Sequence, residues 1–412
     1  MTQRPSHMCR LAGGFTGGSS TAVHRFLTLA TAALIGITAV TPTPAKEFDQ
    51  KSFRRIATFP VFRNTCNGQP DDCISTTTVA EIVAASADGN LLIYTDSATG
   101  NIGFVDITTP SQPQPAGLTA VGEEPTSVAV VGDYALAVIN TSPDLGNPSG
   151  HLAIIDIPSR TVVRTIDLGG QPDSVAVSPA QRYAAIAIEN ERNEDLCVGG
   201  TLDGQEADED DCAAGSGVLG GLPQLPAGFL VIVELAGPPA SWTTQPVDLT
   251  GLAHKFPEDP EPEYVDINRF NVAAVTLQEN NHIVLVHLPS GTIVHHFSAG
   301  RVNLSQVDTQ ENALIELNDP LNDILREPDA VAWISPLQLA TADEGDLDGG
   351  SRGFTVFRLD GHIDFTSGNS IEHIVARLVL DAFAKPNVWY HRGADRLRKL
   401  RGALCCVIAM IR

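Results

Sequence analysis

A repeated pattern of residues constrains the fold of this chain more than any other feature. Each copy opens with a proline and continues through a polar pair and a valine to a turn. It then runs through small apolar residues to an Asn or Glu. The clearest copies read EEPTSVAVVGDYALAVIN, GQPDSVAVSPAQRYAAIAIEN, PEPEYVDINRFNVAAVTLQEN and REPDAVAWISPLQLATADEG. An earlier copy over residues 81–108 lacks the proline. Such self-similarity is typical of repeat architectures.

Further strand-like segments follow each copy. GHLAIIDI, GFLVIVEL, NHIVLVHL and RGFTVFRL come next, and a fourth segment often succeeds them. The apolar runs are five or six residues long and bounded by turns, which favours strands over buried helices. Units of roughly 40–47 residues with three or four strands are typical of β-propeller blades. The sequence therefore predicts an all-β fold, a β-propeller with about five recognisable blades.

The two ends of the chain differ from the repeats. A basic flank precedes the 15-residue apolar run 26–40, and small residues follow it, which predicts a secretory signal peptide over 1–45. A buried helix is the alternative. The propeller is predicted over 46–377. Charge, composition and repeat register all change at the start of 378–412, which is either a basic C-terminal segment or a stretch read out of frame.

Two insertions interrupt the repeats. Residues 190–227 are rich in Gly and acidic residues, and residues 303–325 have a more helix-like pattern. Because loops on a rigid scaffold often carry function, we expect such insertions on a binding face. The acidic run 203–211 within the first insertion is either a cation ligand or a solvated loop.

Four cysteines lie between the predicted signal peptide and the tail. They form two local pairs, Cys66 with Cys73 and Cys197 with Cys212. Two disulfides that each close a short loop would suit an oxidising compartment. Zinc binding is the alternative, but neither pair has CxxC spacing.

The charge of the chain limits its partners. The net charge is −23, and residues 46–377 alone carry 16 basic and 47 acidic residues. Such a body repels nucleic acid and anionic lipid, so we predict neither as a partner. The apolar run 26–40 is too short for a comfortable membrane span, so no span is expected after signal cleavage. Divalent cations are better candidates, and solubility alone is the other explanation of the acidity.

Several long phrases resemble one known family. PEYVDINRFNVAAVTLQENNHIVLV, REPDAVAWI, TADEGDLDGGSRGFTVF and SGNSIEHIVARL are similar to secreted bacterial propellers of the phytase-like (esterase-like) family, often described as alkaline phosphatase-like. The resemblance covers roughly residues 80–377. It implies a seven-bladed, exported propeller that favours metal ions, so further blades would be expected where the tail stands. It fixes no substrate.

Polar residues recur where the second strand of each repeat meets the third. Glu189, Glu279 and Asn280 occupy such tips. Hairpin turns explain them, because Asn tolerates left-handed backbone angles. A shared ring of oxygen ligands for Ca²⁺ is the alternative, because this ion takes about six to eight oxygens. The richest cluster lies in ATADEGDLDGGSRGF, and the full set of predicted metal ligands is Asp343, Glu344, Asp346, Asp348, Glu279, Asn280 and Glu189.

Catalytic candidates are few. The sequence has no G-x-S-x-G elbow and no Ser, His and Asp in recognisable order. His282 is either a general acid or the hydrogen-bonded end of a strand. Arg352 either binds an anionic group such as phosphate or pairs with neighbouring carboxylates. His295 and His296 are adjacent in a predicted strand, so they point to opposite faces and cannot share a metal.

Two functions are compatible with these features. One is a secreted, Ca²⁺-dependent phosphoesterase or esterase, in which metal-activated water hydrolyses a phosphate or carboxylic ester. The other is a non-catalytic extracellular propeller that binds a partner or surface. Both place the protein outside the cytoplasm, either secreted, periplasmic or at the cell surface.

Overall fold

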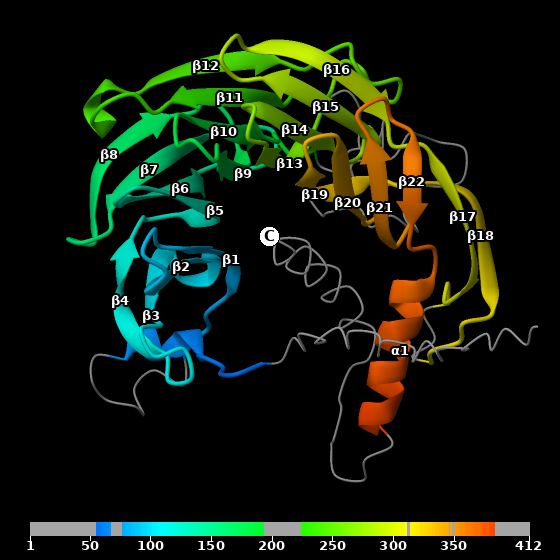
Figure 1. Cartoon of the computed structure of the whole chain (residues 1–412), viewed down its shortest axis with the longest axis horizontal. Helices are drawn as coiled ribbons and strands as arrows, with labels where there is room; N and C mark the ends of the chain where they lie inside the picture. Colours follow the sequence, from blue (N-terminus) through cyan, green and yellow to red (C-terminus); the bar gives the residue numbers. More distant parts are fainter. Residues whose placement is uncertain are drawn as a thin grey trace, which may run out of the picture. The chain divides into compact units, whose positions relative to one another are not determined.

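Five four-stranded antiparallel sheets dominate the computed structural model of this protein (Figure 1). The structure describes residues 55–66, 76–192, 224–310, 314–345, 347 and 351–383, the last six of these by their backbone alone. The predicted signal peptide and most of the predicted basic tail lie outside these ranges. Within these ranges, the short 3-10 helices are η1 (Val61–Thr65), η2 (Ser97–Thr99) and η4 (Pro239–Ser241).

The strands of every sheet lie side by side in chain order. The first sheet contains β1 (Ala80–Ala85), β2 (Leu91–Asp96), β3 (Asn101–Asp106) and β4 (Gln114–Ala120), and the second β5 (Glu124–Val131), β6 (Tyr134–Asn140), β7 (Gly150–Asp156) and β8 (Thr161–Asp167). The third contains β9 (Pro172–Val177), β10 (Tyr183–Ile188), β11 (Phe229–Glu234) and β12 (Thr243–Asp248). The fourth contains β13 (Pro262–Ile267), β14 (Val272–Leu277), β15 (His282–His287) and β16 (Thr292–Ser298), and the fifth β19 (Pro328–Ser335), β20 (Gln338–Asp343), β21 (Gly353–Arg358) and β22 (Ile363–Thr366).

The position of a strand in its sheet determines its burial. The second strands β6 and β10 are apolar on both faces, and their central residues are fully buried. Small residues such as Ala184 and Ala185 let the neighbouring sheets approach closely. The fourth strands β8 and β16 mix apolar with polar residues and are largely exposed, as expected of a strand with one solvated face.

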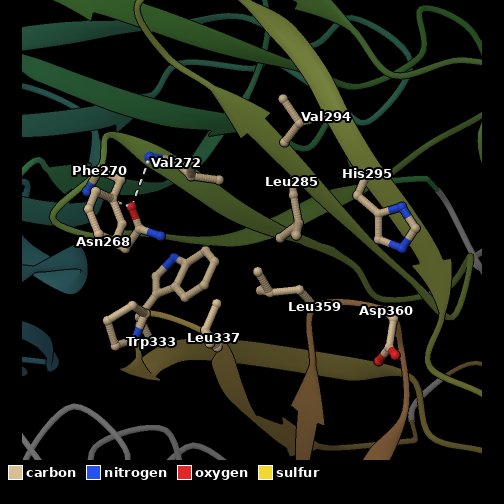
Figure 2. Close-up of a pocket in the computed structure, with 11 residues that line it drawn as sticks. Asn268, Phe270, Val272, Leu285, Val294, His295, Trp333, Leu337, Leu359 and Asp360 are labelled. Carbon is tan, nitrogen blue, oxygen red and sulfur yellow. Dashed lines mark hydrogen bonds between the residues drawn. The ribbon is translucent and has the colours of Figure 1, made fainter.

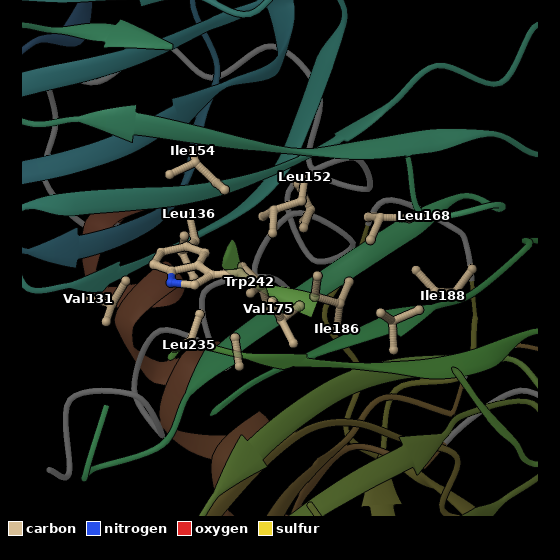
Figure 3. Close-up of a cluster of buried hydrophobic side chains, with 14 residues drawn as sticks. Val131, Leu136, Leu152, Ile154, Leu168, Val175, Ile186, Ile188, Leu235 and Trp242 are labelled. Carbon is tan, nitrogen blue, oxygen red and sulfur yellow. The ribbon is translucent and has the colours of Figure 1, made fainter. Parts of the chain in front are cut away.

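Each sheet packs face to face on the next one along the chain. The core between the second and third sheets includes Leu136, Leu152, Ile154 and Ile186, with Trp242 beside them (Figure 3). Separate apolar cores join the first sheet to the second, the third to the fourth and the fourth to the fifth. Apolar burial of this kind is the main stabilising term of a fold.

The first strands of the five sheets are neighbours in space. β1 contacts β5, β5 contacts β9, β9 contacts β13, and β13 contacts β19. Hydroxyl groups bridge some of these strands: Ser127 Oγ accepts a hydrogen bond from Val175 N at 3.3 Å, and Ser174 Oγ accepts one from Val265 N at 3.4 Å. The repeats are propeller-like, and the predicted all-β fold with about five repeats is confirmed.

The helix-like interpretation of residues 303–325 is wrong. This insertion forms most of a two-stranded antiparallel sheet, β17 (Arg301–Val307) and β18 (Asp319–Leu325). Val302, Leu304 and Val307 are buried together, so pairing across the insertion overrides its local helix preference.

A helix follows the last sheet, which the sequence had not predicted. Helix α1 (Ser370–Phe383) starts inside the segment assigned to the propeller and continues beyond residue 377. Of the other predicted insertion, 190–227, residues 193–223 lie outside the described chain. In the described ranges, no helix is both long and apolar enough to cross a membrane.

Candidate functional site

Acidic residues stand directly after the proline in three repeats. Asp173 begins this pattern on β9, Glu263 repeats it on β13, and Asp329 repeats it on β19. In the second sheet Thr126 takes the same place. All four side chains are half buried. Because their strands are neighbours, the carboxyl groups of the last three sheets converge.

The charges of these groups act on one another. Burial first, and then the charges of Asp329 and Glu191, raise the pKa of Asp173 to about 8. Burial and the charges of Glu189 and Asp173 hold the pKa of Glu263 well above its usual range. The carboxyls therefore crowd into one poorly solvated region, where each resists ionisation of the others.

Two residues from the predicted tips join this region. Glu189 follows β10 and accepts a hydrogen bond from the carboxyl of Glu263. Glu279 follows β14 and donates to the carboxyl of Glu261. Burial, followed by the charge of a neighbouring carboxylate, raises the pKa of both tip residues well above the usual value. We refer to the following six residues as the acidic cluster: Asp173, Glu189, Glu261, Glu263, Glu279 and Asp329.

One arginine compensates part of this charge. Arg192 is fully buried, and its Nε lies 2.6 Å from Glu261 Oε2. Its Nη2 donates to the carbonyl oxygen of Asp259 at 3.0 Å, and the guanidinium stacks over Phe256. Glu279 is 6% exposed, and its Oε2 has no hydrogen-bond partner. Apart from the contact between the carboxyls of Glu279 and Glu261, no described group is paired with this buried oxygen.

The amide side chains at the tips stabilise the loops. Asn190 and Asn281 have positive φ angles of 54° and 50°, so the hairpin-turn interpretation holds for them. Asn280 Oδ1 accepts from Glu261 N at 2.9 Å, and its Nδ2 donates to main-chain oxygens of Lys255, Phe256 and Asp259. These contacts favour a structural role for Asn280 in place of the predicted role as a metal ligand.

The other predicted cluster is only partly described. Asp343 is buried and accepts hydrogen bonds from Thr341 and Thr355 at 2.7 and 2.5 Å. Arg326 Nε lies 3.8 Å from Asp343 Oδ2, and burial raises the pKa of this carboxyl to about 6. The contacts favour a structural role for Asp343 too. Glu344 follows it at the tip, where its main-chain N–H donates to Glu327 O. Asp346 and Asp348 lie outside the described residues.

The two catalytic candidates are both engaged. Arg352 Nη1 lies 3.1 Å from Glu372 Oε1 of α1 and donates to Asp308 O at 2.7 Å. It therefore pairs with a carboxylate that is distant in sequence. His282 is 3% exposed, and its Nε2 lies 2.9 Å from His296 Nδ1. This contact agrees with a hydrogen-bonded strand end. Burial, with the neighbouring imidazoles, lowers the pKa of His282 to about 4, so the ring is neutral at pH 7.

Sequence reasoning found only part of the acidic cluster. It singled out Glu189 and Glu279 but missed Asp173, Glu263 and Asp329. The signal was present, because each missed residue directly follows the proline of its repeat. Successive strand residues point to opposite sides, so in β9 Asp173 lies in the cluster while Ser174 bridges to β13.

Metal and disulfide predictions stay predictions. Across the described ranges, no group of three or more His, Cys, Asp or Glu side chains is arranged to hold a metal ion. Three of the four paired cysteines, Cys73, Cys197 and Cys212, lie outside the described residues, so neither pairing with Cys66 nor the second disulfide is tested.

A comparison with family models matched one domain. Residues 81–207 match the Choice-of-anchor I domain, a stretch that covers the first two sheets and reaches beyond β10. No phytase-like family was matched. The match indicates a protein of the cell surface or exterior. Among curated proteins, none matches this chain.

Solved structures show distant likenesses. A chain in a crystal structure of a mitotic checkpoint complex has a TM-score of 0.42 and 8% identity, covering 70% of this chain and 64% of that one. A chain in a crystal structure of a nidogen/laminin complex has a TM-score of 0.38 and 9% sequence identity, and the match covers 70% of this chain and 80% of that one. Kuenenia stuttgartiensis hydrazine synthase has a TM-score of 0.35 and 16% sequence identity, and the match covers 68% of this chain and 84% of that one. This chain thus spans less than two thirds of the first of them, and we infer no function from these likenesses.

Proposed function

We propose that this protein is an exported β-propeller module that binds a hard divalent cation, Ca²⁺, at the acidic cluster. The unsatisfied Oε2 of Glu279 carries the proposal, since a buried carboxylate oxygen without a partner is costly unless an ion or a proton compensates it. Its neighbours are other carboxyl groups that resist ionisation, and a bound cation would favour their ionised forms.

The donor set fits this class of ion. Asp173, Glu189, Glu263 and Glu279 offer only carboxylate oxygens, which hard cations prefer to nitrogen or sulfur ligands. Bound Ca²⁺ would supply positive charge at this site. The residues themselves would then hold the ends of β9, β10, β13 and β14 together, which would stabilise the contact between the third and fourth sheets.

The surroundings of two arginines near the candidate sites favour a binding module over a phosphoesterase. Binding of a phosphate substrate usually requires an accessible cationic side chain, such as an arginine, that donates to the phosphate oxygens. Arg192 is buried against Glu261, and Arg352 is paired with Glu372. Neither side chain is offered to a substrate in this conformation.

Ca²⁺-dependent hydrolysis of a phosphate or carboxylic ester is the second candidate. The raised pKa of Asp173, about 8, supports it, because such a carboxyl is protonated at neutral pH and could act as a general acid. The resemblance to phytase-like propellers points the same way. A bound ion would supply an activated water in such a site.

Calorimetric titration of chelator-treated protein with CaCl₂ tests the proposal. We expect binding that Asp173→Asn or Glu263→Gln weakens at least about tenfold, a loss of about 1.4 kcal/mol per tenfold. Glu258→Gln, an exposed residue of the loop before β13, serves as the control and should bind like the native protein. Native protein that binds no Ca²⁺ would overturn the proposal, as would variants that bind as tightly as the control.

Hydrolysis assays then separate the two candidates. A generic phosphate ester and a generic carboxylic ester are each incubated with the Ca²⁺-loaded protein, with and without chelator. The binding-module proposal expects no chelator-sensitive turnover. Turnover that the chelator abolishes and that Asp173→Asn reduces would establish the second candidate instead.

A further inference from the structure

Two histidines on neighbouring strands of the fourth sheet lie in direct contact. His282 begins β15, where it is opposite Ser298, and His296 lies on β16 opposite Val284. They are diagonal neighbours on one face, with His282 Nε2 and His296 Nδ1 2.9 Å apart and ring centroids 5.2 Å apart. His282 is buried and His296 is exposed, so the pair lies at the surface with one anchored ring.

The two adjacent histidines of β16 face different surroundings. His295 lines an apolar groove between the fourth and fifth sheets, together with Leu285, Trp333 and Leu337 (Figure 2). His296 instead contacts His282. The alternation predicted from the sequence is therefore present, but it does not isolate His296, because its partner comes from the neighbouring strand.

We propose that His282 and His296 form a two-imidazole chelate for a transition-metal ion, with Zn²⁺ as the representative. The site is separate from the acidic cluster in ligand type. Neutral imidazole nitrogen suits Zn²⁺, Cu²⁺ and Ni²⁺, whereas carboxylate oxygens suit Ca²⁺. The inference does not depend on the proposed Ca²⁺ site.

The geometry of the pair needs little adjustment. Tetrahedral zinc with bonds of about 2.0–2.1 Å to nitrogen places two such ligands about 3.3 Å apart. The observed separation of the two nitrogens is 2.9 Å, so they must open by only a few tenths of an ångström. The ion would replace the hydrogen shared by the two nitrogens, so the ring that donates it would bind as the other tautomer, with its proton on its second nitrogen. The exposed ring of His296 can tilt to present its lone pair to the ion.

A third imidazole lies near the pair. His254, in the loop before β13, is exposed, and its charge contributes to the lowered pKa of His282. The described residues contain no preformed group of three ligands, so the remaining positions on the ion fall to water or to a rearranged His254. With two protein ligands, we expect a dissociation constant on the order of 10 µM, far weaker than in a closed structural zinc site.

Titration with ZnCl₂ in the presence of excess CaCl₂ tests this site, because Ca²⁺ occupies oxygen ligands elsewhere. We expect one Zn²⁺ per chain, with at least about tenfold weaker binding in His296→Gln. The matched control is His295→Gln, which changes the adjacent residue on the opposite face and should keep native affinity. His296 is exposed, so its variant should fold even if the variant of buried His282 does not.

A spectroscopic readout distinguishes the pair from adventitious binding. Electron paramagnetic resonance of the Cu²⁺-loaded protein should show coupling to imidazole nitrogens, which His296→Gln reduces and His295→Gln leaves unchanged. Equal loss in both variants, no loss in His296→Gln, or no Zn²⁺ binding at 100 µM would each overturn the inference. Loss of Ca²⁺ binding alone would overturn the proposed function and leave this site standing.

Discussion

Polar residues on either side of a repeat's proline have different surroundings in this protein. In the fourth sheet, Glu261 precedes Pro262 and contacts Arg192, whereas Glu263 follows it and contacts Glu189. In the sequence alone, Glu261 and Glu263 are indistinguishable polar residues beside a proline. Only the packing of neighbouring strands shows that both face other carboxyls, and that Glu261 alone of the two pairs with Arg192. This is why the sequence predicted acidic tips but missed the acidic first strands.

Neutralising one member of the acidic cluster should have opposite effects with and without cation. In chelator at pH 7, Glu263→Gln removes a carboxyl that has to take up a proton when the chain folds, and should raise the free energy of unfolding by about 1 kcal/mol. In saturating Ca²⁺ it should lower stability relative to the native protein, because a ligand is lost. Thermal unfolding under both conditions, with Glu258→Gln as the control, measures this. A variant that is less stable under both conditions would contradict it.

Asp343 makes a separate contribution to the pH dependence of stability. Burial raises its pKa from 3.8 to about 6, so its stabilising contribution is complete below pH 4 and is lost as pH rises through about 6. The loss is at most about 3 kcal/mol, from about 1.4 kcal/mol per pKa unit.

Urea unfolding between pH 4 and 7 tests this prediction. Asp343→Asn cannot ionise, so native protein should lose stability relative to this variant as pH rises across that range. Parallel curves for the two proteins would show that Asp343 does not titrate there.

Strands differ in how strongly the sequence determines them. Short apolar runs such as YALAVI and YAAIAI are bounded by turns, and each forms the buried second strand that it predicts. Residues 303–325 carry a mixed pattern, and their pairing as β17 and β18 depends on contacts made across the insertion. Helix α1 lies outside the repeat, so the repeated pattern does not predict it.

The sheet-to-sheet cores should be much more sensitive to truncation than the outer strands. Leu152 of β7 is fully buried between the second and third sheets, so Leu152→Ala should cost about 2–5 kcal/mol of unfolding free energy. Val163 of β8 is 51% exposed, and Val163→Ala should cost less than about 0.5 kcal/mol. Denaturant titration of the two variants measures the difference, and comparable losses would show that the face-to-face packing is not the stabilising contact described.

At the scale of the whole molecule, the repeat predicted an all-β fold of about five repeated units. It did not predict which residues converge, because convergence depends on contacts between first strands that are distant in sequence. The acidic residues of this chain are therefore not only spread over its surface, because some of them gather in one place. Carboxyls from three sheets meet at the acidic cluster, where a bound cation would offset the repulsion between them.

The central claim is that these carboxyls hold a hard cation, and anomalous diffraction tests it most directly. Crystals grown with Tb³⁺, which replaces Ca²⁺ at oxygen sites, should give an anomalous difference peak among Asp173, Glu189, Glu263 and Glu279. The same side chains seen well ordered, with no peak between them at saturating Tb³⁺, would contradict the account.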